Sequence, residues 1–408
     1  MLSKKPVLQN ILLITNIPTP YRIPLFNELS RQLKEIDLNL IVAFGALGYE
    51  RRKWQIDMSE CKFEYTVLDG KNLYQGNAEK SSFTYTGLYQ LLAEKKPQAV
   101  IIGGYSIAAI KLWWRSWFYK TPYIIWSGAI NRIGEPKSFI RNLQRKMLIS
   151  RAAGFVAYGT LSKEFLIHLG APPNKIKIGI NTVDTNFFAA GVAKWKNNEA
   201  LDHTRHHLLY IGNLTEGKRL DLLLHAIQEL RQKRDDFVLD IVGTGNALPA
   251  LKQLSSTLKI DDMVKFHGFV DREGLLEYFA NAKCFLFPSN YDVWGLVLVE
   301  AMCAGIPCLS SIYAGATQDL ITEGITGFAL DFKKKEAVAN RINWILDNPR
   351  EAAKIGEKAR KFMAEKVSLK NSANGFKAAI ITSFKKNAEI AKTHPDHTVV
   401  VNPDFRQV

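Results

Sequence analysis

Short apolar runs alternate along this chain with longer segments in which apolar residues recur about every three or four positions. The short runs predict buried strands, and the longer period predicts helices that pack by one face. The predicted strands are 11–15, 38–44, 99–104, 123–126, 154–158, 175–180, 208–212, 237–245 with its glycine turn, 264–269, 284–287, 308–311 and, with a turn, 324–331. The predicted helices are 21–33, 162–169, 220–231, 248–258, 275–281, 295–303, one that begins at 315–319, 334–346, 350–366 and 368–385. This alternation indicates an α/β protein with doubly wound parallel sheets.

The length of the chain favours two domains, because 408 residues exceed one ordinary hydrophobic core. Residues 191–207 are polar and lack a period, so we expect a linker there between a first domain, 1–190, and a second domain, 208–366. His203, His206 and His207 can suggest a metal site, but we favour a solvated linker. We expect a disordered tail over 388–408.

Charge and cysteine usage narrow the possible partners. The formal net charge is +15, and residues 95–163 carry twelve Lys or Arg against one acid. Such a surface suits nucleic acid, anionic lipid or a polyanionic substrate, but no nucleic-acid-binding motif accompanies it, so we expect no nucleic acid. Four cysteines without a CxxC pair suit a reducing cytosol and no structural metal. Residues 1–6 lack the apolar stretch of a signal peptide, and no run reaches the roughly 20 apolar residues that span a bilayer.

Residues 111–120 combine three tryptophans, two other aromatic residues and three bases. One interpretation is a helix packed on the sheet by Trp113 and Trp117. The other is a segment at the headgroup depth of a membrane, which aromatic and basic side chains favour. Three further bases lie four residues apart, which places them on one face of a predicted helix that ends near residue 150. They are Lys137, Arg141 and Arg145. This face is either simply solvated or a basic stripe that binds an anionic surface.

The stretch 284–311 predicts a strand, a loop, a helix and a second strand. Asp292 precedes the helix, and Glu300 lies eight residues on, about two turns along a similar face. Each carboxylate can bind a pair of sugar hydroxyls, or Asp292 can be an N-cap and Glu300 an ordinary helix carboxylate. The helix start offers unsatisfied amides that attract an anion, those of Val293, Trp294, Gly295 and Leu296.

Residues 289–307 resemble the signature of glycosyltransferase family 4, a family of retaining enzymes with the GT-B fold. In that signature two acids eight residues apart flank an aromatic–glycine pair, and a Glu-Ala-Met-Ala-x-Gly-x-Pro segment follows. Here Asp292 stands in place of the commoner Glu, and Cys303 in place of Ala. The resemblance extends over most of 208–331 and is weaker in the first half. It implies two Rossmann-like domains facing each other across a cleft, with a last helix, 367–387, that crosses back to the first domain.

The resemblance assigns the donor site to the second domain. Family members usually have Gly-Arg-Leu and then a Lys five residues after the Arg, which maps the diphosphate-binding lysine onto Lys218. Asn213, after Gly212, stands in place of that Arg, so one cationic contact is absent or is supplied by Arg219. By the same resemblance, Lys218 and Asp292 carry the catalysis.

Two further elements of the second domain fit a nucleotide site. Gly243 and Gly245 follow a predicted strand, although a lone Gly-x-Gly is weak evidence because it also serves ordinary turns. The resemblance implies that Asp292 holds the donor sugar and that Glu300 holds the ribose.

The first domain offers three acceptor-side candidates, namely Arg22, Tyr105 and Ser127. Prolines replace the glycine-rich loop common in the family, and the segment Pro-Tyr-Arg-x-Pro-Leu-Phe is similar to one in a subset of bacterial surface-polysaccharide transferases. Arg22 then either faces the cleft or caps its loop. Tyr105 and Ser127 follow predicted strands, and ligands bind at the carboxyl edge of open α/β sheets. The family often has a histidine in this part of the cleft, and none lies near Ser127.

The resemblance implies a metal-independent, retaining hexosyltransferase that uses a nucleotide-diphosphate sugar and no cofactor. We expect a saccharide acceptor, lipid-linked, in cell-surface polysaccharide synthesis, with the enzyme peripheral on the cytoplasmic face of an anionic membrane. The alternatives are a non-catalytic nucleotide-sugar-binding protein, a glycosyltransferase with a soluble acceptor, and an epimerase or phosphorylase of the same fold.

Overall fold

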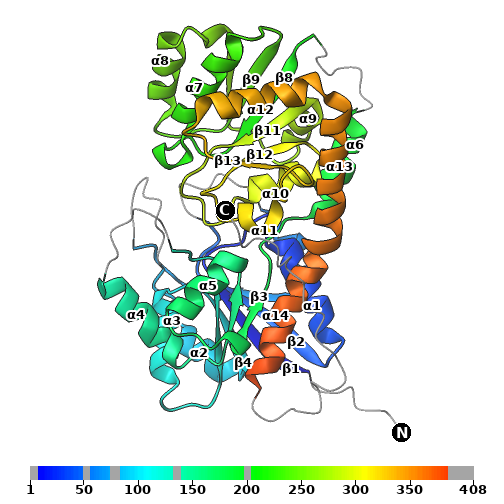
Figure 1. Cartoon of the computed structure of the whole chain (residues 1–408). Coiled ribbons are helices and arrows are strands. Elements are labelled where there is room, and N and C mark those ends of the chain that lie inside the picture. The colour runs from blue at the N-terminus through cyan, green and yellow to red at the C-terminus, as the bar shows by residue number, and fades with distance from the viewer. Residues whose placement is uncertain (1–7, 49–55, 74–82, 132–138, 197–203, 385–408) are drawn as a thin grey trace. The chain divides into compact units, whose positions relative to one another are not determined.

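The chain divides into two units, one of residues Met1–Val183 with Leu369–Val408 and one of residues Asp184–Ser368 (Figure 1). The computed structural model describes residues 8–48, 56–73, 83–131, 139–196 and 204–384. The predicted tail, 388–408, and Lys137 lie outside these residues. Among the described helices, none has the length and apolar character needed to cross a membrane.

Seven parallel strands form the sheet of the first unit, in the order β3-β2-β1-β4-β5-β6-β7. The strands are β1 (Gln9–Thr15), β2 (Leu38–Phe44), β3 (Glu64–Val67), β4 (Ala99–Gly103), β5 (Tyr123–Ser127), β6 (Gly154–Ala157) and β7 (Ile176–Ile178). The helices are α1 (Ile23–Lys34), α2 (Leu88–Lys95), α3 (Ile107–Arg115), α4 (Phe139–Ser150), α5 (Thr160–His168) and α14 (Leu369–Ser383). Side chains along β1 point alternately to the two faces of the sheet, and each face has its own hydrophobic core. Ile11 and Leu13 pack in the core with α1 and α14, whereas Leu12 and Ile14 pack in the core with α2, α3 and α5.

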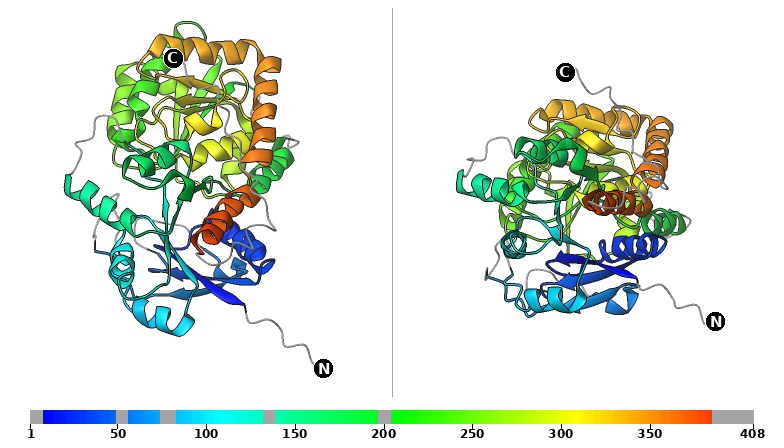
Figure 2. Two further views of the ribbon diagram at one scale, coloured as in Figure 1. Left: turned by 60° about the horizontal axis from the view of Figure 1, so that its bottom comes forward. Right: turned by 90° about the horizontal axis from the view of Figure 1, so that it is seen from below.

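The last helix, α14, is an integral part of the first unit, although it follows the second unit in sequence. It lies beside α1 on one face of the sheet (Figure 2). Gly375 permits a close approach, because a Cβ there would lie 2.1 Å from the carbonyl oxygen of Ile178. Phe376 is fully buried, with its ring centroid 5.0 Å from that of Trp126.

Six parallel strands form the sheet of the second unit, in the order β10-β9-β8-β11-β12-β13. The strands are β8 (His206–Ile211), β9 (Phe237–Val242), β10 (Val264–Gly268), β11 (Ala282–Phe287), β12 (Cys308–Ser311) and β13 (Phe328–Leu330). The helices are α6 (Thr185–Lys196), α7 (Leu220–Arg231), α8 (Leu248–Thr257), α9 (Leu275–Asn281), α10 (Leu296–Cys303), α11 (Thr317–Leu320), α12 (Lys335–Asp347) and α13 (Pro349–Lys366). Each unit is thus a Rossmann-like domain, as the alternating pattern predicts.

The predicted boundary between the domains is wrong in its details. Residues 184–190 belong to the second unit, and 191–196 of the predicted linker continue the helix α6. Phe188 on α6 is buried, with its ring centroid 5.9 Å from that of Phe279 on α9. Gly191 lets the two helices approach, since a Cβ there would lie 2.7 Å from the Leu276 side chain. Tertiary packing therefore outweighs the weak periodicity of this segment.

The first strand of the second unit begins inside the predicted linker and carries a buried polar network. His207 is buried, contrary to a solvated linker, and its Nδ1 lies 2.5 Å from Oδ2 of Asp240 on β9. Nε2 of His267 on β10 lies 2.7 Å from the other oxygen, Oδ1. Burial alone would raise the pKa of Asp240, but hydrogen bonds with the two histidines outweigh it and hold that pKa below its usual value.

We expect Asp240→Asn to lower the free energy of unfolding by about 2 kcal/mol at neutral pH, because a buried charge-assisted pair is lost. A depressed carboxyl pKa stabilises the fold above the unfolded value and is lost as pH falls through the folded value. The deficit of the variant should therefore be full near pH 7 and shrink below about pH 4. Urea unfolding at both pH values measures it, with Asp235→Asn, an exposed neighbour, as the control. An equal deficit in the two variants would contradict this role of the network.

Candidate functional site

The loops that follow β8, β9, β11 and β12 in the second unit meet at the carboxyl edge of its sheet. The amide of Asn290 donates to Gly217 O at 3.1 Å, and that of Gly315 donates to Asp292 O at 2.9 Å. The amide of Leu214 donates to the Thr244 carbonyl at 2.9 Å. These bonds join four chain segments into one surface, at the edge where open parallel sheets bind ligands.

Lys218 and Asp292 form an ion pair on this surface, although 74 positions separate them in sequence. Lys218 ends the short 3₁₀ turn Glu216–Lys218, and its Nζ donates to Oδ2 of Asp292. The two side chains are only 22% and 17% exposed, so water screens the pair weakly. The structure therefore brings together the two residues expected to carry the chemistry.

The loop between β11 and α10 gives Asp292 its position. Helix α10 begins at Leu296, one residue later than predicted, because Gly295 adopts a left-handed conformation with φ +92°. A Cβ at Gly295 would lie 2.5 Å from the Phe287 ring. The amide of Trp294 donates to Oδ1 of Asp292 at 3.3 Å. This amide is one of the four that the sequence predicts to bind an anion, and it already has an acceptor. Asp292 is not the N-cap, which was the alternative interpretation, because Gly295 holds that position and the bond from Trp294 lies in the loop before the helix. The other oxygen of Asp292 meets Lys218.

Glu300 lies inside α10 in a strongly desolvated setting. It is partly exposed, yet burial raises its pKa to about 8, and the positive charge of Arg272 offsets only part of that rise. The guanidinium of Arg272 in turn stacks 3.8 Å above the Phe187 ring. At neutral pH the Glu300 carboxyl is therefore mostly protonated and can donate a hydrogen bond as well as accept one.

The glycines of the two loops allow backbone to lie against backbone. Gly243 has φ +140°, and a Cβ there would lie 1.9 Å from the carbonyl oxygen of Gly212. A Cβ on Gly245 would lie 2.1 Å from Leu214 O. The carbonyl of the exposed Asn213 accepts a hydrogen bond from the buried Tyr210 hydroxyl at 3.1 Å. These glycines thus fix the loop geometry, which is the structural interpretation of the Gly-x-Gly pattern.

Arg219 is engaged elsewhere. It has a left-handed backbone conformation, with φ +53°, and its guanidinium donates to Asp221 in three hydrogen bonds of 2.9 Å, 3.3 Å and 2.8 Å. The cationic contact that Asn213 cannot supply is therefore not replaced by a free Arg219 side chain. Among the described residues, no group of three or more His, Cys, Asp and Glu is arranged to hold a metal ion.

In the first unit, Arg22 lies at the carboxyl edge of its sheet. Its guanidinium donates to the hydroxyls of Thr15 at 3.0 Å and Tyr158 at 2.8 Å, and it stacks 4.2 Å above the Trp126 ring. Sequence reasoning did not single out Tyr158 or Trp126 as partners. Tyr158 follows an apolar strand directly, the same signal that pointed to Tyr105.

Tyr105 and Ser127 are close to each other at the same edge. Burial raises the pKa of the Tyr105 phenol, and Ser127 and Arg145 lower it in part. The guanidinium carbon of Arg145 lies 5.3 Å from the centroid of the Tyr105 ring, and Ser127 Oγ accepts a hydrogen bond from the Ala129 amide at 3.1 Å. The structure thus places all three acceptor-side candidates at the ends of β1, β4 and β5.

Residues 192–362 match the family described as Glycosyl transferases group 1. This segment is a group 1 glycosyltransferase domain. It contains Lys218, Asp292 and Glu300, together with the glycine loops.

Curated relatives resemble part of the chain. N-acetyl-alpha-D-glucosaminyl L-malate synthase of Bacillus anthracis is 28% identical over 195 residues, 47% of this chain and 50% of the relative. A GDP-mannose-dependent alpha-(1-6)-phosphatidylinositol monomannoside mannosyltransferase of Mycolicibacterium smegmatis is 31% identical over 157 residues, 37% of this chain and 41% of the relative. The chain spans about half the length of the first curated relatives that it matches.

Solved structures resemble nearly the whole chain. HepE of Anabaena, crystallised in complex with UDP, superposes with a TM-score of 0.71 at 16% identity, covering 92% of this chain and 100% of HepE. At this identity the likeness shows the fold alone. The chain with the group 1 domain thus has the GT-B fold, with two Rossmann-like domains.

Proposed function

We propose that this protein is a glycosyltransferase that moves a hexose from a nucleotide-diphosphate sugar to a saccharide acceptor with retention of anomeric configuration. The observation that carries the proposal is the ion pair of Lys218 and Asp292 beside the start of α10, within a group 1 domain. HepE is described with UDP bound, which supports a nucleotide donor for this fold.

In this proposal Lys218, Asp292 and Glu300 each bind a different part of the donor. When a donor diphosphate enters, the Lys218 ammonium exchanges Asp292 for phosphate oxygens and offsets the charge that builds on the leaving diphosphate. Asp292 is then free to accept hydrogen bonds from the hydroxyls of the sugar. Glu300, with its protonated carboxyl, is suited to hold the ribose. In this proposal a lysine and backbone amides supply the positive potential, so the reaction needs neither a metal ion nor a cofactor.

We place the acceptor on a lipid carrier at the cytoplasmic face of a membrane, for cell-surface polysaccharide synthesis. The rival was a soluble acceptor, with Trp113 and Trp117 both packed in the core. Trp113 does pack against the core, but Trp117 is 58% exposed, and on α4 Phe139 and Ile140 are each 79% exposed. Aromatic, aliphatic and basic side chains on one domain suit an anionic membrane surface. The M. smegmatis relative is named for a phosphatidylinositol acceptor.

A donor screen tests this function directly. Purified protein is incubated with a panel of nucleotide sugars, and release of nucleoside diphosphate is measured with and without an isoprenoid-diphosphate saccharide. We expect one nucleotide sugar to be turned over, faster with the lipid-linked acceptor than with the same saccharide free in solution. Proton NMR of the product should show the anomeric configuration of the donor. Binding without turnover of any nucleotide sugar would favour the non-catalytic alternative.

A further inference from the structure

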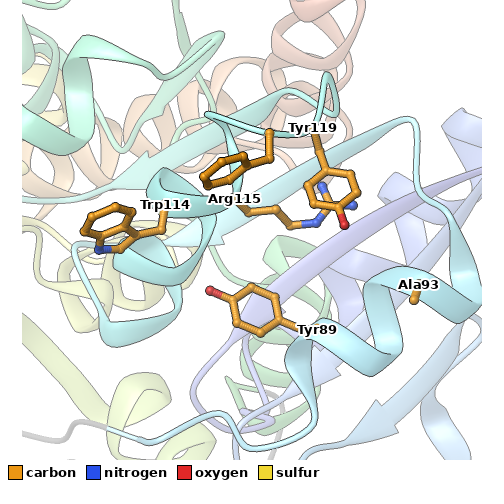
Figure 3. A pocket seen from close by; sticks show the side chains of 6 residues that line it. Tyr89, Ala93, Trp114, Arg115 and Tyr119 are labelled. Atoms are coloured by element: carbon orange, nitrogen blue, oxygen red, sulfur yellow. The ribbon is translucent and has the colours of Figure 1, made fainter.

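A cavity in the first unit lies apart from every residue discussed as a donor or acceptor contact. It measures about 340 Å³ and is lined by residues of α2, α3 and the turn that follows α3: Tyr89, Ala93, Trp114, Arg115, Phe118 and Tyr119. Figure 3 shows the Arg115 side chain extending toward Tyr119, with the rings of Tyr89 and Trp114 facing the same space. Its volume is at the low end of the roughly 300–1,000 Å³ of small-molecule pockets, which suits a headgroup rather than a whole lipid.

The walls of the cavity are fixed by bonds outside it. The Tyr89 hydroxyl donates to the Lys111 carbonyl at 3.2 Å, which joins α2 to α3. Arg151 donates to Oγ and the carbonyl of Ser116, at 2.8 Å and 2.7 Å, and stacks 4.1 Å above the Trp117 ring. The turn after α3 is therefore anchored, and the cavity is a preformed feature of the domain.

Arg115 is the unusual member of this lining. Its guanidinium lies 4.1 Å from the centroid of the Tyr119 ring and, within the described parts of the chain, has no hydrogen bond or ion pair of its own. Burial lowers the pKa of Arg115. Lys111 and Arg151, by contrast, both donate to backbone oxygens nearby. A partly desolvated cation without an anionic partner attracts one, since its lost hydration is then replaced.

The rim of the cavity is apolar and exposed. Four aromatic residues there are at least half exposed, namely Tyr89, Trp114, Phe118 and Tyr119, and Phe118 reaches 80%. Exposed aromatic groups around a cation are unfavourable in water but suit the boundary between headgroups and acyl chains. Within 95–163 the sequence holds a single acid, and Glu94, beside Ala93 on α2, is paired with Lys95 at 3.0 Å.

We propose that this cavity binds the phosphate of one anionic membrane lipid, with the phosphate oxygens on the Arg115 guanidinium and the carbons next to the headgroup between the aromatic rings. The inference rests on the membrane contact proposed above and gives that contact a specific site. A free phosphate would satisfy Arg115 but would leave the apolar rim in water, so a lipid is the occupant that meets both features.

Vesicle flotation tests the site with Arg115→Gln, which removes the charge and preserves much of the volume. Binding to vesicles of phosphatidylcholine and phosphatidylglycerol should fall about 30-fold, because a charge-assisted hydrogen bond is lost along with one basic charge. The control is Lys120→Gln, an exposed base outside the lining, which should cost about fivefold. Equal losses in both variants would overturn the site in favour of diffuse electrostatic attraction. Inorganic phosphate or glycerol 3-phosphate should compete poorly, and competition at the strength of the vesicles would overturn the lipid assignment.

A second measurement keeps the inference testable if Arg115→Gln folds poorly. Lipids brominated near the headgroup should quench tryptophan fluorescence of the unaltered protein, and Trp114→Phe should lose part of this quenching. Trp344→Phe, on α12 of the other unit, should retain it. Unchanged quenching in Trp114→Phe would place the cavity outside the bilayer and contradict the proposal. Hydrolysis of nucleotide sugar without vesicles should be normal in Arg115→Gln, so a failure of the lipid site and a failure of the proposed transfer are distinguishable.

Discussion

Replacing Lys218 by alanine is expected to lower kcat/KM for sugar transfer by a factor of about 10² to 10³. The ammonium pairs with Asp292 and, in the proposed reaction, offsets charge on the leaving diphosphate. Loss of one such electrostatic contact typically costs about 3 to 4 kcal/mol in the transition state. Loss of the mostly buried ion pair should cost about 2 to 3 kcal/mol of folding stability, less than the stability of an ordinary domain. The rate of sugar transfer by Lys218→Ala should therefore fall strongly while the variant stays folded.

Initial rates with saturating and limiting donor measure this effect, and far-UV circular dichroism verifies the fold. Lys354→Ala, an exposed lysine on α13 of the same domain, is the matched control and should act like the unaltered enzyme. Lys218→Arg retains the charge but not the compact ammonium, so it should recover only part of the rate. Near-normal transfer by Lys218→Ala would remove this residue from the mechanism.

The second large effect concerns Glu300 and depends on pH. Burial raises the pKa of its carboxyl from 4.5 to about 8 in the folded protein. The unfolded chain therefore releases this proton at a lower pH than the folded protein does, and stability falls as pH rises from about 4.5 to about 8. Glu300→Gln cannot ionise, so it should be more stable than the unaltered protein at pH 8.5, by about 4 kcal/mol.

The same variant separates stability from donor binding. At pH 4.5 the two proteins should unfold with nearly equal free energies, and the difference should grow with pH and level off above about pH 8. Glu300→Ala should weaken binding of the nucleotide about tenfold or more, because its ribose loses a hydrogen-bonding partner. Chemical denaturation across this pH range and calorimetric titration with nucleoside diphosphate measure the two effects. A pH-independent difference between Glu300→Gln and the unaltered protein would show that Glu300 is well hydrated.

The sequence predicts the strand-and-helix alternation well, because apolar periodicity is a local property. It predicts β11, the loop and α10 nearly in register, although β11 begins two residues earlier than predicted and α10 one residue later, after Gly295. Strand β3 and helix α2 escape prediction, since β3 has mostly exposed side chains and α2 spans eight residues. Helix α6 was not predicted because its contacts with α9 come from a segment about 90 residues away.

The site is predictable only in part. Resemblance identified Lys218 and Asp292, but their contact arises from the turn at Gly217 and its bond to Asn290, which no local pattern encodes. The pairing of Arg219 with Asp221 is local, at a spacing of two, and engages the arginine that was offered as a replacement for the missing cationic contact. The partners of Arg22 lie on β1, on β5 and directly after β6, so only the folded sheet reveals Tyr158 and Trp126 beside it.

The inclusion of α14 in the first unit has a consequence for synthesis on the ribosome. Phe376, Ala379 and Ile380 complete the core around Trp126 and Val156, and they are translated only after the whole second unit. Domains usually fold in the order in which they emerge, but here the amino-terminal domain must wait for the last helix while the second domain has all its residues earlier. A nascent chain halted before residue 369 would therefore expose an uncovered apolar sheet face to chaperones, although its second unit would already be complete.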